Sequence, residues 1–282
     1  MKKIINSFLK KLINFVVPVM VKTSIGRELH QLILNNAMNQ TQKVEHQGVG
    51  LVFFTPDGVS KWRVDGFSTK EPETLEWIDG MPRSSVFWDI GANVGLYTCY
   101  AVKARGCRVF SFEPSVFNME MLARNIFLNG IVDQATIIPL PLSDTVAINK
   151  LNMTTTEWGG ALSTFGESYG YDGQPLVKVF EFSTISLSMK NAHELFGIPL
   201  PDFIKIDVDG IEHLILKGGA VVLENAQSVL IEICEEFPEQ AEGAAHYLTA
   251  AGLQLKEKRR SDEIKSISES TYNQIWHREL GP

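Results

Sequence analysis

The stretch Val86-Phe87-Trp88-Asp89-Ile90-Gly91-Ala92-Asn93-Val94-Gly95 decides the fold of this chain. Its first half is a short apolar run, typical of a strand that is buried on both faces. Its second half is a glycine-rich turn, and a segment with helical periodicity follows from Leu96. A strand that enters a helix through such a turn is the usual place where an α/β protein holds a nucleotide, so we expect a Rossmann-like α/β fold.

The spacing of the turn residues favours one nucleotide cofactor over another. Dinucleotide-binding enzymes use G-x-G-x-x-G, but Gly91, Asn93 and Leu96 fill the three glycine positions here. The middle glycine lets the backbone approach a pyrophosphate, and Asn93 obstructs that approach. S-adenosylmethionine has no pyrophosphate. The turn therefore predicts that Gly91, Asn93 and Gly95 bind S-adenosylmethionine and that Asp89 meets its ammonium group; an ordinary tight turn is the alternative.

Two further carboxylates follow the next two strands. Glu113 ends the strand after Asp89, 24 residues along the chain, where a ribose-binding acid is expected. We predict that it accepts hydrogen bonds from both ribose hydroxyls. Ser143 and Asp144 follow the third strand, and we predict that Asp144 accepts a hydrogen bond from the adenine amino group. For Asp144, capping of the turn is the alternative.

These motifs together resemble the FkbM family of methyltransferases. The resemblance is carried by residues 89–95, Phe112-Glu113-Pro114, Leu142-Ser143-Asp144 and Lys205-Ile206-Asp207-Val208-Asp209-Gly210-Ile211-Glu212, and it spans about residues 71–276. It implies the seven-stranded methyltransferase fold and O-methylation of natural products or carbohydrates. One departure is Ser186-Leu187-Ser188, where the family often has Thr-Leu-Asp.

The order of the apolar runs predicts the sheet. Five runs, most of them separated by helix-length segments, predict parallel strands at residues 86–90, 108–112, 135–140, 203–208 and 229–234. Two later runs predict an antiparallel edge pair, at residues 253–258 and 272–277. We expect three parts: an amphipathic helix over residues 1–22, an extension over 23–70 that contains a β-hairpin (residues 49–54 and 62–64), and the methyltransferase domain over 71–282.

The fourth parallel strand carries the residues that we expect to be catalytic. Strand alternation delivers Asp207 and Asp209, and Glu212 and His213 follow at the start of a helix. We predict that Asp207 positions the substrate or the cofactor and that Glu212 or His213 takes the hydroxyl proton. The alternative is a divalent-metal site on Asp207, Asp209 and Glu212, but we predict none because a second carboxylate group is missing.

Two other residues are expected at the substrate. Glu232 on the fifth strand is an acid that we predict to face the substrate. The long irregular segment 154–175 is rich in Gly, Ser, Thr and Tyr, as binding loops often are. Within it, Trp158 offers an aromatic face that can stack on a sugar, with simple loop packing as the alternative.

Charge and cysteine content limit the partners and the compartment. The chain has a formal charge of −7; residues 1–22 carry five lysines and no acid, so the other residues carry −12. This distribution argues against nucleic-acid binding. The three cysteines form no C-x-x-C pair and indicate a reduced, cytoplasmic protein. We expect residues 1–22 to lie on the inner face of a membrane; packing on protein, including a second copy in a homo-oligomer, is the alternative.

The sequence thus predicts an S-adenosylmethionine-dependent O-methyltransferase that acts on a sugar hydroxyl of a glycan or glycolipid precursor. A natural-product hydroxyl is the second substrate class. A scaffold that binds the cofactor without catalysis and a nicotinamide oxidoreductase are the alternatives of a different class.

Overall fold

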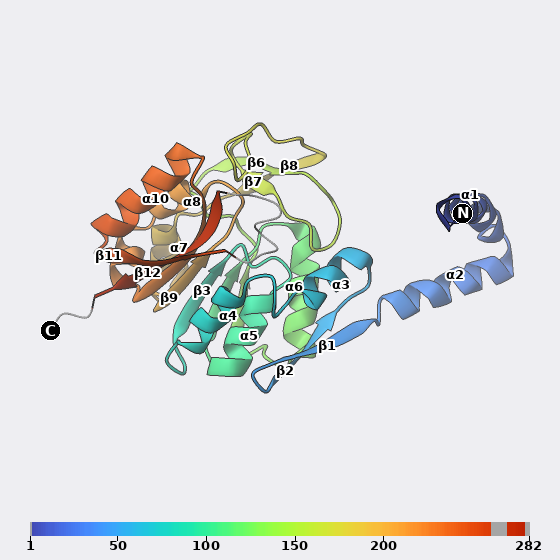
Figure 1. Cartoon of the computed structure of the whole chain (residues 1–282), viewed down its shortest axis with the longest axis horizontal. Helices are drawn as coiled ribbons and strands as arrows, with labels where there is room; N and C mark the ends of the chain where they lie inside the picture. Colours follow the sequence, from blue (N-terminus) through green and yellow to red (C-terminus); the bar gives the residue numbers. More distant parts are fainter. Residues whose placement is uncertain (1, 261–269, 280–282) are drawn as a thin grey trace.

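A seven-stranded sheet forms the centre of the molecule, with the strand order β11-β12-β10-β9-β3-β4-β5 (Figure 1). The structure is a computed structural model that describes residues 2–260 and 270–279. The strands are β3 (Val86–Ile90), β4 (Arg108–Phe112), β5 (Ala135–Ile138), β9 (Phe203–Ile206), β10 (Ser228–Cys234), β11 (Leu253–Arg259) and β12 (Thr271–Arg278).

Strands β3, β4, β5, β9 and β10 pair in parallel, whereas β12 runs antiparallel to both β10 and β11. The predicted Rossmann-like seven-stranded sheet with an antiparallel pair at its edge is therefore confirmed. The sheet has a switch point at β3: the chain continues to β4 on one side of β3 and later returns to β9 on its other side. Ligands of open α/β sheets bind at such a switch point, beyond the carboxyl ends of the strands.

Helices cover both faces of the sheet, which explains why its strands are apolar at successive positions. On one face, Phe87 and Phe203 pack against α4 (Pro72–Asp79), α5 (Leu96–Arg105) and α6 (Val116–Leu128). On the other face, Trp88 and Ile204 pack against a second group of helices. These are α7 (Met189–Phe196), α8 (Glu212–Lys217), α9 (Ala220–Asn225) and α10 (Pro238–Ala250).

The N-terminal hairpin differs from the predicted one. Strand β2 (Val49–Phe54) pairs with the preceding β1 (Thr41–His46), and residues 62–64 lie in helix α3 (Gly58–Asp65). The prediction of a strand there was wrong because Asp57 begins a helix: its side chain accepts the Ser60 amide and Ser60 returns a bond in a capping box. Leu51, Phe53, Val64 and Phe67 join the core cluster of Phe87, so the packing is continuous across the expected boundary at residue 70.

A second, three-stranded sheet lies over the carboxyl ends of the central strands (Figure 1). It consists of β6 (Ile148–Met153), β7 (Ser163–Phe165) and β8 (Phe180–Ile185), in the order β7-β6-β8. Strand β7 lies within the segment that we expected to be irregular throughout. Leu151 and Phe165 belong to the same core cluster as Trp88 and Ile204, so this small sheet is packed against the domain.

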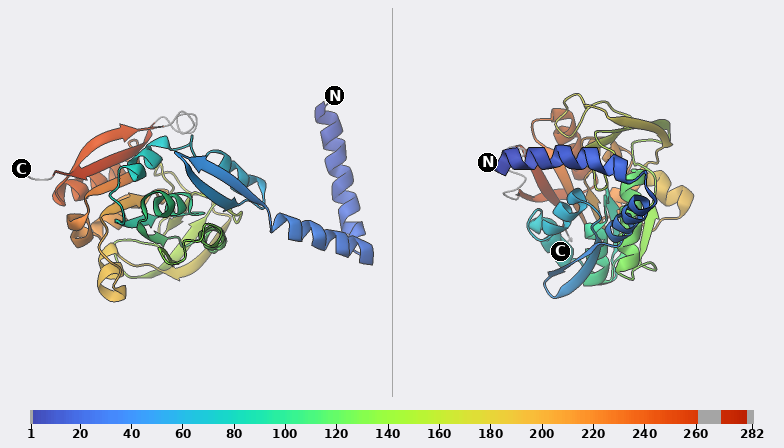
Figure 2. Two further views of the ribbon diagram at one scale, coloured as in Figure 1. Left: turned by 90° about the horizontal axis from the view of Figure 1, so that it is seen from below. Right: turned by 90° about the vertical axis from the view of Figure 1, so that its right-hand side faces the viewer.

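Two helices form an arm that projects from the domain (Figure 2). Helix α1 (Lys2–Met20) lies in the head and is followed by α2 (Ser24–Ala37). Among the arm residues whose burial the structure describes, only Gly26 is buried. Of the helices in the described part of the chain, none combines the length and the hydropathy that a membrane-spanning segment needs.

Candidate functional site

The turn after β3 has the sharp backbone that its glycines predict. Gly91, Asn93 and Gly95 all have positive φ angles, of 84°, 50° and 81°. A Cβ on Gly91 would lie 1.8 Å from the carbonyl oxygen of Asp207, and one on Gly95 would lie 2.3 Å from Leu122 Cδ1. The glycines therefore let the loop after β9 and helix α6 approach the turn closely.

Asp89 lies beneath this turn, fully buried. Thr98 Oγ1 donates a hydrogen bond of 2.6 Å to Asp89 Oδ2, and Oδ1 has no partner among the described residues. Burial raises the pKa of Asp89, and the nearby ammonium of Lys205 opposes this shift. Asp89 does not line the large cavity described below. A direct contact with the cofactor's ammonium stays a prediction that this side-chain position does not favour.

Glu113 is buried beside the turn and keeps free acceptor capacity. Its Oε2 accepts the Asn93 amide at 2.8 Å, and its Oε1 accepts the Ser115 amide at 2.8 Å. Burial raises the pKa of Glu113 to about 7. The Asn118 side chain also forms a hydrogen bond with Glu113. An ionised carboxylate has about four acceptor positions, so acceptor capacity remains for ribose hydroxyl groups.

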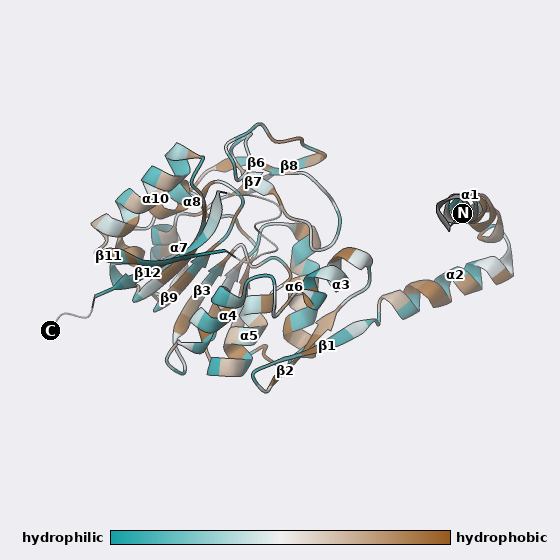
Figure 3. Ribbon diagram, in the orientation of Figure 1, coloured by the Kyte–Doolittle hydropathy of each residue, from teal (hydrophilic) through white to brown (hydrophobic). Residues whose placement is uncertain are grey.

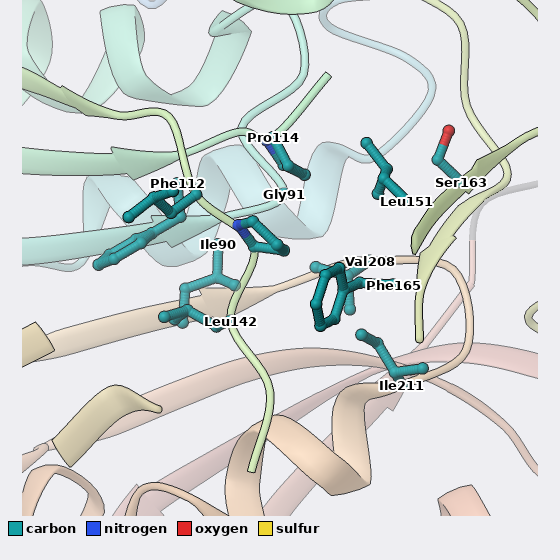
Figure 4. Close-up of a pocket in the computed structure, with 12 residues that line it drawn as sticks. Ile90, Gly91, Phe112, Pro114, Leu142, Leu151, Ser163, Phe165, Val208 and Ile211 are labelled. Carbon is teal, nitrogen blue, oxygen red and sulfur yellow. The ribbon is translucent and has the colours of Figure 1, made fainter. Parts of the chain in front are cut away.

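A narrow apolar cleft of about 30 Å³ lies at the end of β4 (Figure 4). Pro114 and Leu142 lie on one side of it, and Leu151 and Phe165 from the small sheet lie on the other. Flat apolar walls of this kind suit an aromatic base.

Ser143 and Asp144 follow this cleft in the chain but do not line it. The Ser143 amide bonds the Leu187 carbonyl at 2.8 Å. The Asp144 carboxylate pairs with Lys217 Nζ at 2.9 Å. A contact of Asp144 with adenine stays a prediction, and it would compete with this ion pair.

A larger cavity of about 360 Å³ lies on the other side of Gly91. Gly91 lines both the cleft and the cavity. Glu113 lies between them, because it precedes Pro114 of the cleft and accepts a hydrogen bond from the amide of Asn93, which lines the cavity. This arrangement fits a long molecule with an apolar base, a diol and a charged amino-acid end. The residues that line the larger cavity are Trp62, Arg63, Lys70, Glu71, Gly91, Ala92, Asn93, Val94, Leu96, Tyr97, Ala161, Leu162, Tyr171, Lys205, Asp207, Asp209, Glu232 and Thr271.

Charged groups from β9 and β10 meet in this cavity. Lys205 is 1% exposed, and its Nζ lies 2.7 Å from Asp207 Oδ2. Burial alone raises the pKa of Asp207, but the Lys205 ammonium outweighs it and holds the pKa below its ordinary value. Burial, reinforced by the charges of Asp207, Glu71 and Asp209, raises the pKa of Glu232 well above its ordinary value. The cavity thus contains a carboxylate that stays ionised, Asp207, beside one whose proton affinity is raised, Glu232.

Asp209 helps to close the cavity from the side of the small sheet. Its Oδ2 accepts the Leu162 amide at 2.7 Å and the Ser163 amide at 3.3 Å. Burial and the charge of Asp207 raise the pKa of Asp209 to about 6. The sequence-based prediction treated Asp209 as a metal ligand only in the alternative that we set aside. Within residues 2–260 and 270–279, no group of three or more His, Cys, Asp or Glu side chains is placed to hold a metal ion.

Glu212 and His213 lie away from the cavity. The Glu212 carboxylate accepts the amides of Val208 and Gly210 and the side-chain amide of Gln240, and burial raises its pKa to about 7. His213 packs edge-on against Phe237, with ring centroids 5.9 Å apart. Burial lowers the pKa of His213. The structure brings Asp207 and Glu232 to the cavity but does not bring these two predicted bases there.

Trp158 packs against Phe54, with ring centroids 6.4 Å apart, and does not line the cavity. Tyr97 and Tyr171 are aromatic residues that line the cavity. Trp62 of α3 also lines it, accompanied by Arg63 and Lys70. These three residues precede the expected domain boundary, so the sequence-based prediction missed them. In the sequence, the only indication of their role was that Lys70 directly precedes Glu71, the first residue of the resemblance to the family.

Comparisons with known proteins give two sequence matches. Residues 89–257 match the Methyltransferase FkbM domain family. The chain is 26% identical over 184 residues to the hexuronic acid methyltransferase AglP of Haloferax volcanii, covering 64% of this chain and 69% of that protein.

Among solved structures, the chain is similar to M. jannaschii TYW2 in complex with AdoMet, at 13% identity and a TM-score of 0.42, covering 85% of this chain and 87% of that chain. A putative rRNA-methylase from Clostridium thermocellum is 9% identical with a TM-score of 0.46, covering 76% of this chain and 98% of that chain.

Proposed function

Since the chain belongs to the FkbM methyltransferase family and is an S-adenosylmethionine-dependent methyltransferase, we propose that it methylates a hydroxyl group of a sugar in a glycan or glycolipid precursor. The observation that carries this proposal is the cavity beside Gly91, in which Asp207 and Glu232 stand next to the turn that binds the methyl donor. The name of the Haloferax volcanii relative supports a sugar as the acceptor.

The described residues fit the methyl donor in three sections. The cleft of Pro114 and Leu142 holds the adenine, Glu113 accepts the two ribose hydroxyls, and the turn at Gly91 and Asn93 receives the amino-acid end. When bound, S-adenosylmethionine supplies a methyl group on a positively charged sulfur. The protein's own task is then to orient the acceptor hydroxyl and to remove its proton.

Asp207 and Glu232 divide that task according to their proton affinities. Asp207 stays ionised beside Lys205, so its free oxygen accepts a hydrogen bond from the acceptor hydroxyl and orients it. Burial and the neighbouring acids raise the pKa of Glu232 well above its ordinary value, so Glu232 is the general base of this proposal. When the acceptor oxygen takes the methyl group and the methyl–sulfur bond of the donor breaks, the Glu232 carboxylate would receive the hydroxyl proton.

A methyl-transfer experiment tests the sugar assignment. The protein is incubated with donor carrying a labelled methyl group and with extracted cell-surface glycans, and the sugars released by hydrolysis are analysed by mass spectrometry. We expect sugars that have gained one labelled methyl group on oxygen. Label found only in phenolic or polyketide acceptors supplied in parallel would assign the protein to natural-product hydroxyls, and cofactor binding without any transfer would indicate a scaffold.

We also propose that the helical arm attaches the enzyme to an anionic membrane surface. Exposed apolar side chains of α1, including Phe15 at 73% and Ile13 at 55%, share that helix with Lys10 and Lys11, and Figure 3 shows hydrophobic patches continuing along α2. The positive head complements anionic lipid, whereas the body of the chain, at −12, is repelled by it. The arm would thus hold the cavity near lipid-linked sugars at the cytoplasmic face.

A further inference from the structure

The mouth of the large cavity is formed by residues that precede the matched family domain. Trp62 and Arg63 come from α3, and Lys70 comes from the turn that follows it. The Trp62 side chain is 47% exposed, which is unusual for so large an apolar ring. The Arg63 guanidinium lies 5.9 Å and the Lys70 Nζ lies 6.0 Å from its ring centroid. An open indole ring is therefore flanked by two cations.

Arg63 is held in place by a hydrogen bond to the backbone and not by an ion pair. Its Nε donates a hydrogen bond to the Gly159 carbonyl, and the Gly159 amide in turn donates to Asn118 Oδ1 at 3.0 Å. Among residues 2–260 and 270–279, no carboxylate lies within ion-pair distance of the Arg63 guanidinium. A guanidinium that faces a cavity in a fixed orientation, with its terminal amino groups available, is suited to bidentate binding of an anion.

Four acids also line this cavity, and two of them form ion pairs with its lysines. Lys70 is paired with Glu71, at 3.4 Å from Nζ to Oε1, and Asp207 is paired with the buried Lys205. Arg63 forms no ion pair among the described residues, although its charge acts to lower the pKa of Asp207 and Asp209. A planar aromatic face beside this cation matches a pyranose ring that stacks through its C–H face and carries a negatively charged substituent at its edge.

We propose that Trp62, Arg63 and Lys70 form a subsite for an anionic pyranose, whose charge is either a carboxylate or a phosphate. The inference rests on the proposed sugar O-methyltransferase function and specifies the acceptor: Trp62 stacks on the ring, while Arg63 and Lys70 bind the anion. The anionic end is thereby held at the mouth, and a ring hydroxyl points inward to Asp207 and Glu232.

Binding of a matched set of sugars tests the subsite. The full chain, saturated with the demethylated cofactor, is titrated calorimetrically with methyl glucuronide, methyl glucoside 6-phosphate and the neutral methyl glucoside. We expect at least one anionic sugar to bind about tenfold more tightly than the neutral one, because a bidentate charged contact contributes that much. The stronger of the two anionic sugars identifies carboxylate or phosphate.

Variants locate the preference. Arg63→Gln and Lys70→Gln should each reduce the preference for the anionic sugar, and Trp62→Leu should weaken all three sugars alike. Lys61→Gln, on the same helix but outside the cavity, is the matched control and should change nothing. Affinity for the demethylated cofactor, measured in each variant, reports that the fold is intact and should not change.

Three results would overturn the subsite. One is equal binding of the neutral and anionic sugars by the wild type; the sugar function then stands and only the subsite fails. A second is a loss of cofactor affinity in Arg63→Gln, which would assign the guanidinium to the methionine carboxylate. A third is a cofactor-loaded protein that binds no sugar, which removes the proposed function as well.

Discussion

At the scale of single residues, Glu232 is the side chain whose chemistry the proposed reaction depends on most. It lines the cavity half-buried, and no hydrogen bond engages its carboxylate within the described residues. Burial and three neighbouring acids hold its pKa well above the ordinary value. A carboxylate that is costly to ionise without a partner binds a proton strongly, which is the property that a general base needs.

Glu232→Gln keeps the shape of the side chain but cannot accept a proton. We expect kcat to fall about 100-fold or more, with the dissociation constant of the methyl donor unchanged. In the wild type, kcat should fall as the pH drops below the raised pKa of Glu232, because the base is then protonated, and the variant should lack this limb. Glu235→Gln, an exposed acid just after β10, is the control. Full turnover in Glu232→Gln would remove Glu232 as the base.

At the scale of elements, the turn from β9 into α8 determines which acids reach the cavity. Asp209 and Gly210 have positive φ angles of 64° and 130°, so the chain reverses sharply after Asp207. Glu212 then points back into the turn and bonds the Val208 and Gly210 amides and Gln240. Glu212 is thus in a position to hold the turn together.

Glu212→Ala should therefore lower stability more than it lowers chemistry. Loss of a buried carboxylate that accepts several hydrogen bonds should reduce the free energy of unfolding by about 2 to 3 kcal/mol, measured by urea denaturation. At temperatures well below its melting temperature, the Glu212→Ala variant should keep most of the wild-type kcat. Normal stability combined with a large fall in kcat would return Glu212 to the role of base that the sequence suggested. His213→Ala, on the same helix, serves as a comparison and should reduce the free energy of unfolding by less.

The same elements explain what could be predicted from sequence. Strands such as Val86–Ile90 were predictable because burial on both faces leaves a continuous apolar run. Helix α3 was missed because its helical signal is the capping box of Asp57 with Ser60, which competes with a turn-like Pro-Asp-Gly motif. The orientations of Glu212 and His213 depend on backbone reversals that spacing does not encode. The contribution of Trp62 depends on tertiary packing of the extension, which no local pattern specifies.

At the scale of the whole molecule, the positive arm stands apart from an acidic body (Figure 2). We expect the full chain to sediment with anionic vesicles and a protein that starts at Thr23 to stay in solution. Each lysine near the surface contributes about 1 kcal/mol, so salt should weaken the binding by screening.

Lys10→Glu and Lys11→Glu give the matched control, because they reverse the charge while the apolar side chains of α1 remain. The double variant should lose most of the binding to anionic vesicles. Equal sedimentation of the full and shortened proteins would end the membrane proposal. Loss of a dimer on shortening, without vesicle binding by the full chain, would instead assign the arm to contact with a second copy.

The central claim is that the methyl donor lies across the Gly91 turn with its ribose on Glu113, and its affinity as a function of pH tests this most directly. Burial raises the pKa of Glu113 to about 7 in the free protein. The ionised form accepts both ribose hydroxyls, whereas the protonated form has lost an acceptor position. Binding should therefore be full above this pKa and should weaken as the pH falls through it.

Calorimetric titration with S-adenosylmethionine should give about tenfold weaker binding near pH 6 than near pH 8, since about one carboxyl in ten is then ionised. Glu113→Gln should bind about 1.5 to 3 kcal/mol more weakly than the wild type near pH 8, where Glu113 is ionised, and should lose this pH dependence, so the difference should shrink near pH 6. Glu120→Gln on α6, an exposed acid paired with Arg124, should behave as the wild type. A folded Glu113→Gln protein with wild-type affinity and an unchanged pH profile would contradict the account.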